Sequence, residues 1–214
     1  MILHTYWRSS CAYRVRIVLG LKGIEYEPRF VHLVRDGGEQ YRSEFLQKSP
    51  LGQVPVLELE QAGAPVFLSQ SLAIIEYLEE RFPTPALLPK DALARACARE
   101  LAQIVNSAIQ PFQNTGTTNF LQQVAPDLDR PRWYRHFIGR GLATLEARAK
   151  SLAGRFLVGD ELSIADTLLV PQLYAARRVE LPLDAYPTLL RVEAECLKLD
   201  GFAVAHPDRQ PDRE

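Results

Sequence analysis

Residues 9–16, with the sequence SSCAYRVR, place two hydroxyls and a thiol where a short apolar run gives way to a helical pattern. The N-terminus of a helix presents free N–H groups and about half a positive charge, so it can hold an anion. A serine hydroxyl there can donate a hydrogen bond to a thiolate, which favours the charged form of the thiol. Ser9, Ser10 and Cys11 therefore suit thiolate chemistry, although helix capping is the simpler interpretation of the serines.

Two later segments have features that suit a peptide-like ligand. Pro55 opens an alternating run, and a cis proline there would expose the backbone of Val54 for pairing with an extended ligand. Gln70 and Ser71 stand at the start of another helical pattern, where a hydroxyl and free N–H groups can hold a carboxylate. An ordinary trans proline at a strand start and simple N-capping are the alternatives.

The elements that would carry these residues follow from the apolar spacing of the N-terminal part. Helices are predicted at residues 11–22, ended by Gly23, and at 71–82. Strands are predicted at residues 2–6, 26–32, 56–60 and 66–68. The order β-α-β, link, β-β-α is thioredoxin-like and brings the three segments to one surface. An anion site, a backbone-pairing site and a carboxylate site together suit a short acidic peptide with a thiol, namely glutathione.

A proline-rich stretch separates this part from a purely helical one. Residues 83–89 (PTPALLP) predict a linker between a thioredoxin-like domain at 1–82 and an all-helical domain at 90–214. Helical patterns occupy residues 91–107, 132–152, 163–176 and 187–199, and the polar last ten residues predict a surface tail. Within the third of these helices, Ser163 and Asp166 fit a capping box, so we assign Asp166 to folding.

The composition excludes several classes of protein. The chain has 214 residues, of which 47% are hydrophobic and 24% charged, as in an ordinary globular protein. A formal net charge of −1 gives no bulk attraction for nucleic acid or an anionic membrane. No apolar run approaches the ~20 residues of a membrane span, and the N-terminus does not resemble a signal peptide, which predicts a cytoplasmic protein. Cys11, Cys97 and Cys196 lack disulfide or zinc spacing, and the histidines show no metal motif.

Several motifs resemble the zeta-class glutathione transferases, and the resemblance covers nearly the whole chain. The most specific is RSSCAYRVR at residues 8–16, in which Tyr13 replaces a tryptophan of the family. The other matches are QVP at 53–55, QSLAIIEYLEE at 70–80, IQPFQN at 109–114, VGD at 158–160, AD at 165–166, LVPQ at 169–172 and HPDRQP at 206–211.

The resemblance implies a glutathione transferase fold, a homodimer and glutathione as the cofactor. It implies that Ser9 stabilises the glutathione thiolate, with Ser10 and Cys11 beside it. The residues that it implies as further contacts of the tripeptide are Gln40, Val54, Gln70, Ser71, Gln110 and Asn114. The implied activity is glutathione-dependent cis–trans isomerisation of maleylacetoacetate to fumarylacetoacetate, in the breakdown of tyrosine and phenylalanine.

In this reaction the thiolate would add to the cis double bond, the bond would rotate, and elimination would restore it as trans. No metal is required, but the substrate carboxylates need partners. Arginine binds carboxylates with its planar fork, and our candidates are Arg8 and Arg178. Solvated surface charges are the alternative for both, and Arg177 competes with Arg178 for the role.

Other functions stay open at this stage. Maleylpyruvate isomerisation uses the same chemistry, but the related enzymes carry Asn-Arg-Arg where this chain has Asn114-Thr115-Gly116, which favours maleylacetoacetate. The family's typical Asn-Leu-Ser is also absent at that point. A general transferase acting on halogenated acids would use the same site. A binding module without activity and a disulfide reductase working through Cys11 are the remaining alternatives.

Overall fold

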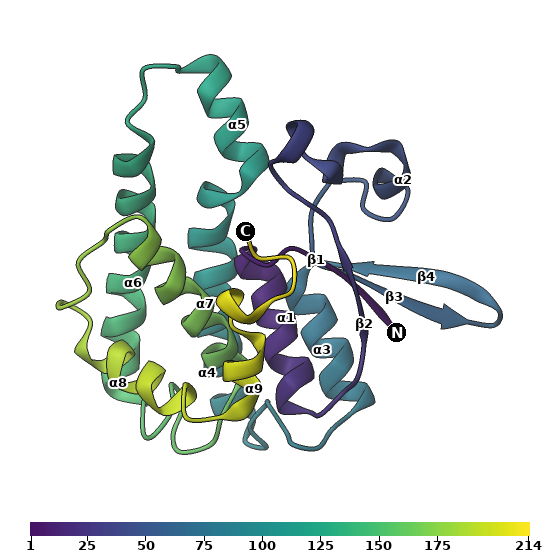
Figure 1. Cartoon of the computed structure of the whole chain (residues 1–214). Helices are drawn as coiled ribbons and strands as arrows, with labels where there is room; N and C mark the ends of the chain where they lie inside the picture. The colour runs from purple at the N-terminus through teal and green to yellow at the C-terminus, as the bar shows by residue number, and fades with distance from the viewer. The chain divides into compact units, whose positions relative to one another are not determined.

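The first unit of the structure is built on a four-stranded sheet. The structure is a computed structural model that describes residues 1–214 (Figure 1). It divides into two units, Met1–Pro85 with Lys198–Glu214 and Ala86–Leu197. The strands are β1 (Ile2–Thr5), β2 (Glu27–Phe30), β3 (Val56–Gln61) and β4 (Ala64–Ser69). Their order in the sheet is β2-β1-β3-β4, with β1 and β2 parallel and the other pairs antiparallel. This topology confirms the predicted thioredoxin-like arrangement.

The helices of this unit are α1 (Ser10–Leu21), α2 (Ser43–Leu46) and α3 (Ser71–Arg81), with 3₁₀ turns at Arg35–Gly37 and Glu39–Tyr41. Helix α1 begins at the Ser9 cap and ends before Gly23, whose φ of 63° needs a residue without a side chain. Its residues from Ala12 to Leu19 are all buried, so the helix packs on more than one side. Figure 1 shows α3 beside α1.

The C-terminal segment belongs with this first unit, which differs from the predicted domain at 90–214. Helix α9 (Asp200–Ala205) lies along α1 (Figure 1) and is followed by a 3₁₀ turn at Pro207–Arg209. The contact is so close that a Cβ atom on Gly201 would lie 2.6 Å from the backbone nitrogen of Leu21. A six-residue helix docked through a glycine has no periodic pattern that reveals its partner, which explains the difference.

The second unit is entirely helical, as predicted. It contains α4 (Ala92–Gln103), a π-helical segment (Ile104–Ile109), a 3₁₀ turn (Gln110–Gln113), α5 (Thr115–Val124), α6 (Arg130–Leu152), α7 (Ile164–Arg178) and α8 (Pro187–Cys196). The π-helical segment interrupts the single helix expected at 91–107. Helix α5 was not predicted from the sequence, because its first five residues are threonine, glycine and asparagine, which favour helices weakly. No helix of the chain combines the length and the apolar character that crossing a bilayer requires.

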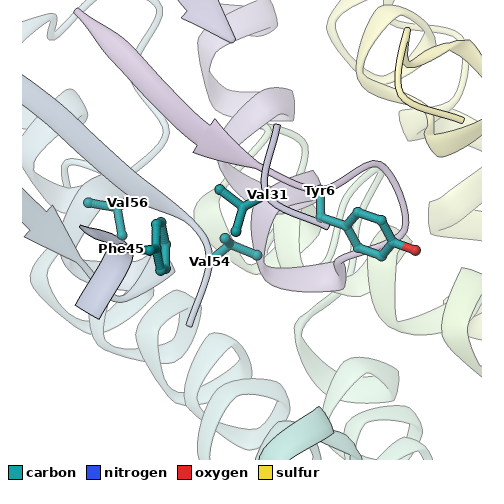
Figure 2. Packing of buried hydrophobic residues seen from close by; sticks show 5 residues of the cluster. All are labelled: Tyr6, Val31, Phe45, Val54 and Val56. Atoms are coloured by element: carbon teal, nitrogen blue, oxygen red, sulfur yellow. The ribbon is translucent and has the colours of Figure 1, made fainter. Parts of the chain in front are cut away.

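A small apolar cluster connects the segments of the first unit that carry the predicted site. It consists of Tyr6, Val31, Phe45, Val54 and Val56, all no more than 7% exposed. Figure 2 shows that Tyr6 lies at one end of the cluster, with its ring directed away from Phe45 and Val56. The cluster thereby fixes the end of β1, the loop after β2, α2 and the start of β3 relative to one another.

Candidate functional site

Ser9 is the N-cap of α1, and its hydroxyl accepts a hydrogen bond within the chain but does not donate one. The hydroxyl oxygen accepts a hydrogen bond of 3.2 Å from the backbone N–H of Ala12, and the hydroxyl proton has no acceptor within the chain. Ser10 and Cys11 follow in the first turn, and all three side chains are partly exposed. The structure therefore brings the three predicted residues together beside the free N–H groups of a helix start, where a negative charge is favoured.

The backbone around Val54 has the form that the sequence suggested. The Val54–Pro55 peptide bond is cis. Neither the N–H nor the C=O of Val54 has a hydrogen-bond partner within the chain, although the residue is only 7% exposed. Buried backbone groups almost always have hydrogen-bond partners, so the unbonded N–H and C=O of Val54 are suited to pairing with an extended ligand.

The start of α3 presents Gln70 and Ser71 in different ways. Gln70 is exposed, has a φ of 73°, and its Nε2 lies 3.5 Å from Oε1 of Gln53. Ser71 is 4% exposed, and its hydroxyl oxygen accepts a hydrogen bond of 3.2 Å from the guanidinium of Arg14. The hydroxyl of Ser71 is thus bonded to a buried guanidinium and does not act as a simple helix cap.

Gln40, predicted as a ligand contact, is almost completely buried. The residue is 1% exposed, and its Nε2 donates to the carbonyl of Leu33 at 3.2 Å. Its Oε1 atom is buried and has no hydrogen-bond partner. A buried acceptor without a donor carries a desolvation cost, so the carbonyl end of this amide is suited to accepting a bond from a ligand.

Two buried arginines of α1 hold this site and were not recognised as such from the sequence. The guanidinium of Arg16, 2% exposed, donates to the carbonyls of Tyr6 and Trp7 at 3.2 and 2.9 Å and to the hydroxyl of Thr5. Arg14 is fully buried, and burial lowers the pKa of its guanidinium. In the sequence, Arg14 and Arg16 stand out as two charged residues in an otherwise apolar helix, and charged residues are rarely buried without specific partners.

Arg8, the predicted carboxylate ligand of this unit, is partly exposed between Trp7 and Ser9. Its guanidinium lies 5.5 Å from the centre of the Trp7 ring, within the range of a cation–π contact. Such stacking holds the planar group in place while its edges stay open to a ligand.

In the second unit, the predicted residues Gln110 and Asn114 begin a chain of amides. Nε2 of Gln110 donates to Oδ1 of Asn114 at 2.8 Å, and Nε2 of Gln113 reaches Oε1 of Gln110 at 3.4 Å. Nε2 of Gln113 also donates to Oε1 of Gln172 at 2.9 Å. Gln172 is fully buried in α7, and its own Nε2 has no partner. The amide chain connects α7 to the start of α5.

Arg177 and Arg178 at the end of α7 are both exposed. The guanidinium of Arg177 forms a bidentate pair with Glu193, with one bond of 2.6 Å. This engagement raises the pKa of Arg177 through its hydrogen bond to Glu193.

The remaining singled-out residues have structural roles. The predicted capping box is confirmed, because the carboxylate of Asp166 accepts bonds from Ser163 and from the N–H of Leu157 at 2.8–2.9 Å. Complete burial raises the pKa of Asp166 to about 6. Cys196 is a core residue, and burial raises the pKa of its thiol, whereas Cys97 is only half buried.

Comparison with known proteins places these features in one family. Residues 8–81 match the model of the N-terminal domain of glutathione S-transferases, and residues 137–200 match that of the C-terminal domain. A maleylacetoacetate isomerase of Mus musculus is 44% identical over 99% of this chain and 94% of its own length. The crystal structure of maleylacetoacetate isomerase from Anaeromyxobacter dehalogenans 2CP-1, with glutathione in its active site, is 50% identical and has a TM-score of 0.90 over 100% of this chain and 97% of that one. A zeta-class maleyl pyruvate isomerase from a bacterium is 39% identical, with a TM-score of 0.93 over the full length of both chains.

Proposed function

Because this chain belongs to the glutathione S-transferase family, we propose that it is a zeta-class, glutathione-dependent isomerase that converts maleylacetoacetate to fumarylacetoacetate. The observation that carries the proposal is the hydroxyl of Ser9, which stands at the start of α1 with its proton unused by the chain. A donor in that position, beside the positive end of a helix, is suited to holding a thiolate. The names of the similar proteins reported above support the choice of substrate.

The chain offers a matching contact for each part of glutathione. The N–H and C=O of Val54 can pair with the backbone of the ligand, as in the addition of a short strand. Gln70, Ser71 and the free N–H groups of α3 can hold a carboxylate, with the charge of Arg14 behind Ser71. The unpartnered Oε1 of Gln40 can accept a hydrogen bond from the ligand. We also propose Gln110 and Asn114 of the second unit as ligand contacts.

Bound glutathione supplies a thiolate that adds to the cis double bond of the substrate and leaves again after the bond has rotated. Ser9 keeps the thiol in its charged form by donating a hydrogen bond, and the first turn of α1 stabilises the same charge. Ser10 and Cys11 lie beside this point and can assist it. Since the nucleophile comes from glutathione, no protein thiol has to take part in covalent catalysis.

Two arginines are our candidates for the carboxylates of the substrate. Arg8 adjoins Ser9 and is held by the ring of Trp7, so its fork can meet a carboxylate near the reacting thiolate. Arg178, exposed at the end of α7, is the second candidate, and the guanidinium of the neighbouring Arg177 is paired with Glu193. Binding of the substrate carboxylates would hold the double bond in a fixed place while the bond rotates.

The proposal includes a homodimer in the cytoplasm. Leu51 and Val66 of the first unit are 70% and 40% exposed, and a second copy of the chain would remove such apolar side chains from water. The three cysteines are all free thiols, which fits a reducing compartment. Sedimentation at several protein concentrations would test the dimer, and a purely monomeric species would contradict it.

Maleylpyruvate is the second candidate substrate, favoured by the similarity to a structure named maleyl pyruvate isomerase. The experiment is to follow isomerisation of both compounds by absorbance, with and without glutathione. Rapid turnover of maleylacetoacetate only when glutathione is present would support the proposal. Faster turnover of maleylpyruvate would keep the mechanism but change the substrate. No turnover of either compound would contradict the isomerase function.

A further inference from the structure

The C-terminal segment makes a direct hydrogen bond to the turn that leads into Ser9. Oδ2 of Asp212 accepts a bond of 2.8 Å from the backbone N–H of Trp7, which lies two residues before Ser9. The two residues are 205 positions apart in the chain, so the contact exists only because α9 docks on α1. A bond from an N–H group to a carboxylate is shorter and stronger than a neutral one.

The other polar groups of this turn are held by Arg16. Its guanidinium donates to the carbonyls of Tyr6 and Trp7, and the carbonyl of Tyr6 also accepts the N–H of Ser9 at 3.0 Å. Nε of the same guanidinium donates to the carbonyl of Ala205, the last residue of α9, at 3.2 Å. Both peptide groups that flank Trp7 are therefore held by hydrogen bonds. Asp212 belongs to the C-terminal segment, and Arg16 is bonded to that segment through Ala205.

The end of the segment also contacts the stretch that precedes Gln40. Glu214 pairs with Arg35 and lies 3.2 Å from Nε2 of His32. Nδ1 of His32 accepts bonds from the N–H groups of Val34 and Arg35, and Nε2 is the ring nitrogen that lies near Glu214. These contacts are exposed, with more than half of the Arg35 and Glu214 side-chain surfaces in solvent, so they add little stability.

A pocket of about 410 Å³ lies between the C-terminal segment and the rest of the first unit. Its lining includes Tyr6, His32, Arg35 and Asp212. Oδ1 of Asp212 is buried and has no hydrogen-bond partner. A half-satisfied carboxylate is a poor choice for attaching a tail, because its desolvation offsets much of what the bond to Trp7 contributes. The arrangement is better explained by a requirement for that one bond.

We propose that Asp212 is a positioning residue that sets the turn at residues 6–9, and with it the Ser9 hydroxyl, from the far end of the chain. The inference rests on the proposed function, since it requires Ser9 to act on the thiol of glutathione. Asp212 touches neither glutathione nor substrate in this role. Its bond to Trp7 and the bonds of Arg16 hold the turn from opposite sides.

The test compares Asp212→Ala and Asp212→Asn with Asp208→Ala as the matched control. Asp208 belongs to the same segment, and its carboxylate pairs only with His206 and Arg213 of that segment. We expect Asp212→Ala to lower kcat by about 10- to 100-fold while changing the KM for glutathione much less. The pKa of the bound glutathione thiol, measured by the ultraviolet absorbance of the thiolate, should rise. Asp212→Asn retains an acceptor and should recover most of the activity.

A second variant covers the case in which Asp212→Ala fails to fold. A chain ending after Gln210 lacks both Asp212 and Glu214, and it should fold and show the same loss of kcat and the same rise of the thiol pKa. A folded variant with the wild-type thiol pKa and kcat would overturn the proposal, and so would the failure of both variants to fold. If the wild-type protein itself neither binds glutathione nor isomerises, the proposed function has failed instead.

Discussion

The guanidinium of Arg14, buried in α1, donates a hydrogen bond of 3.2 Å to the hydroxyl oxygen of Ser71, the first residue of α3. Because the oxygen is used as an acceptor, the hydroxyl proton of Ser71 can be donated elsewhere. The bond also places a buried positive charge behind a helix start that already favours anions. The two helix starts that we propose as the thiolate site and the carboxylate site are thus tied together.

Ser71→Ala should lower both stability and glutathione affinity. The substitution leaves Arg14 without this acceptor in a buried place, and we expect the free energy of unfolding to fall by about 1–3 kcal/mol. The KM for glutathione should rise, since the hydroxyl and part of the fixed charge are lost. Ser43→Ala at the exposed start of α2 is the control and should change neither quantity. An unaltered KM for Ser71→Ala would remove Ser71 from the site.

Ser9→Ala should reduce kcat strongly while the fold is retained. Loss of one donor to a developing or full negative charge lowers rates by about 10²–10³-fold. Loss of the helix cap should reduce stability by only about 1 kcal/mol. Ser10→Ala serves as the comparison and should have the smaller effect on kcat. The reverse order of the two effects would transfer the main role to Ser10.

The pH dependence of stability should reveal the buried carboxyl of Asp166. Its pKa of about 6 lies above its value of about 3.8 in the unfolded chain, so the folded state binds the proton more tightly between these values. The stabilisation of the folded state by this protonated carboxyl is fully present below about pH 4 and is lost as pH rises through about 6. The shift in pKa corresponds to about 3 kcal/mol in the free energy of unfolding.

Asp166→Asn provides the comparison for this pH effect. The variant should be less stable at every pH, because its amide group faces the N–H donors of Ser163 and Leu157. Chemical denaturation from pH 4 to 7 should show the stability difference between wild type and variant shrinking as pH rises. A difference that does not vary with pH would contradict the raised pKa.

Most of the fold could be predicted from the sequence, because the signals that indicate its helices and strands are local. The strict alternation of β3, the cap of α1 and the prolines before the helical unit lie within short windows. The docking of residues 198–214 on the first unit was not predictable in this way. It depends on the close approach at Gly201 and on the bonds of Arg16 to Ala205 and of Trp7 to Asp212, whose partners lie 189 and 205 residues apart in the chain.

The segments that form the candidate site could be predicted from the sequence, but the contacts between their residues could not. Ser9, Val54 and Ser71 could be selected because each stands where an element begins. The partners of these residues could not be selected, since a buried arginine and a surface arginine look alike in sequence. The bond from Arg14 to the hydroxyl of Ser71, for example, joins residues that are 57 positions apart.

The amide chain in the second unit gives a prediction that separates binding from stability. Gln172→Leu removes the acceptor of Gln113, but it also removes a buried N–H group that has no partner. We therefore expect the free energy of unfolding to change by less than about 1.5 kcal/mol. The KM for glutathione should rise, because Gln113 no longer steadies Gln110 and Asn114.

Gln123→Leu, on the exposed side of α5, is the matched control for this variant and should leave the KM unchanged. Equal KM values for Gln172→Leu, Gln123→Leu and wild type would show that the amide chain has no part in ligand binding. A large loss of stability in Gln172→Leu alone would indicate a purely structural role.

The most direct test of the central claim is the balance of glutathione during turnover. Wild-type protein is given a large excess of maleylacetoacetate over glutathione, and both the trans product and free glutathione are quantified by mass spectrometry. An isomerase that uses glutathione as a cofactor converts many equivalents of substrate and returns all the glutathione unchanged. Consumption of one glutathione per substrate, with a stable conjugate as product, would identify a conjugating transferase and contradict the proposed function.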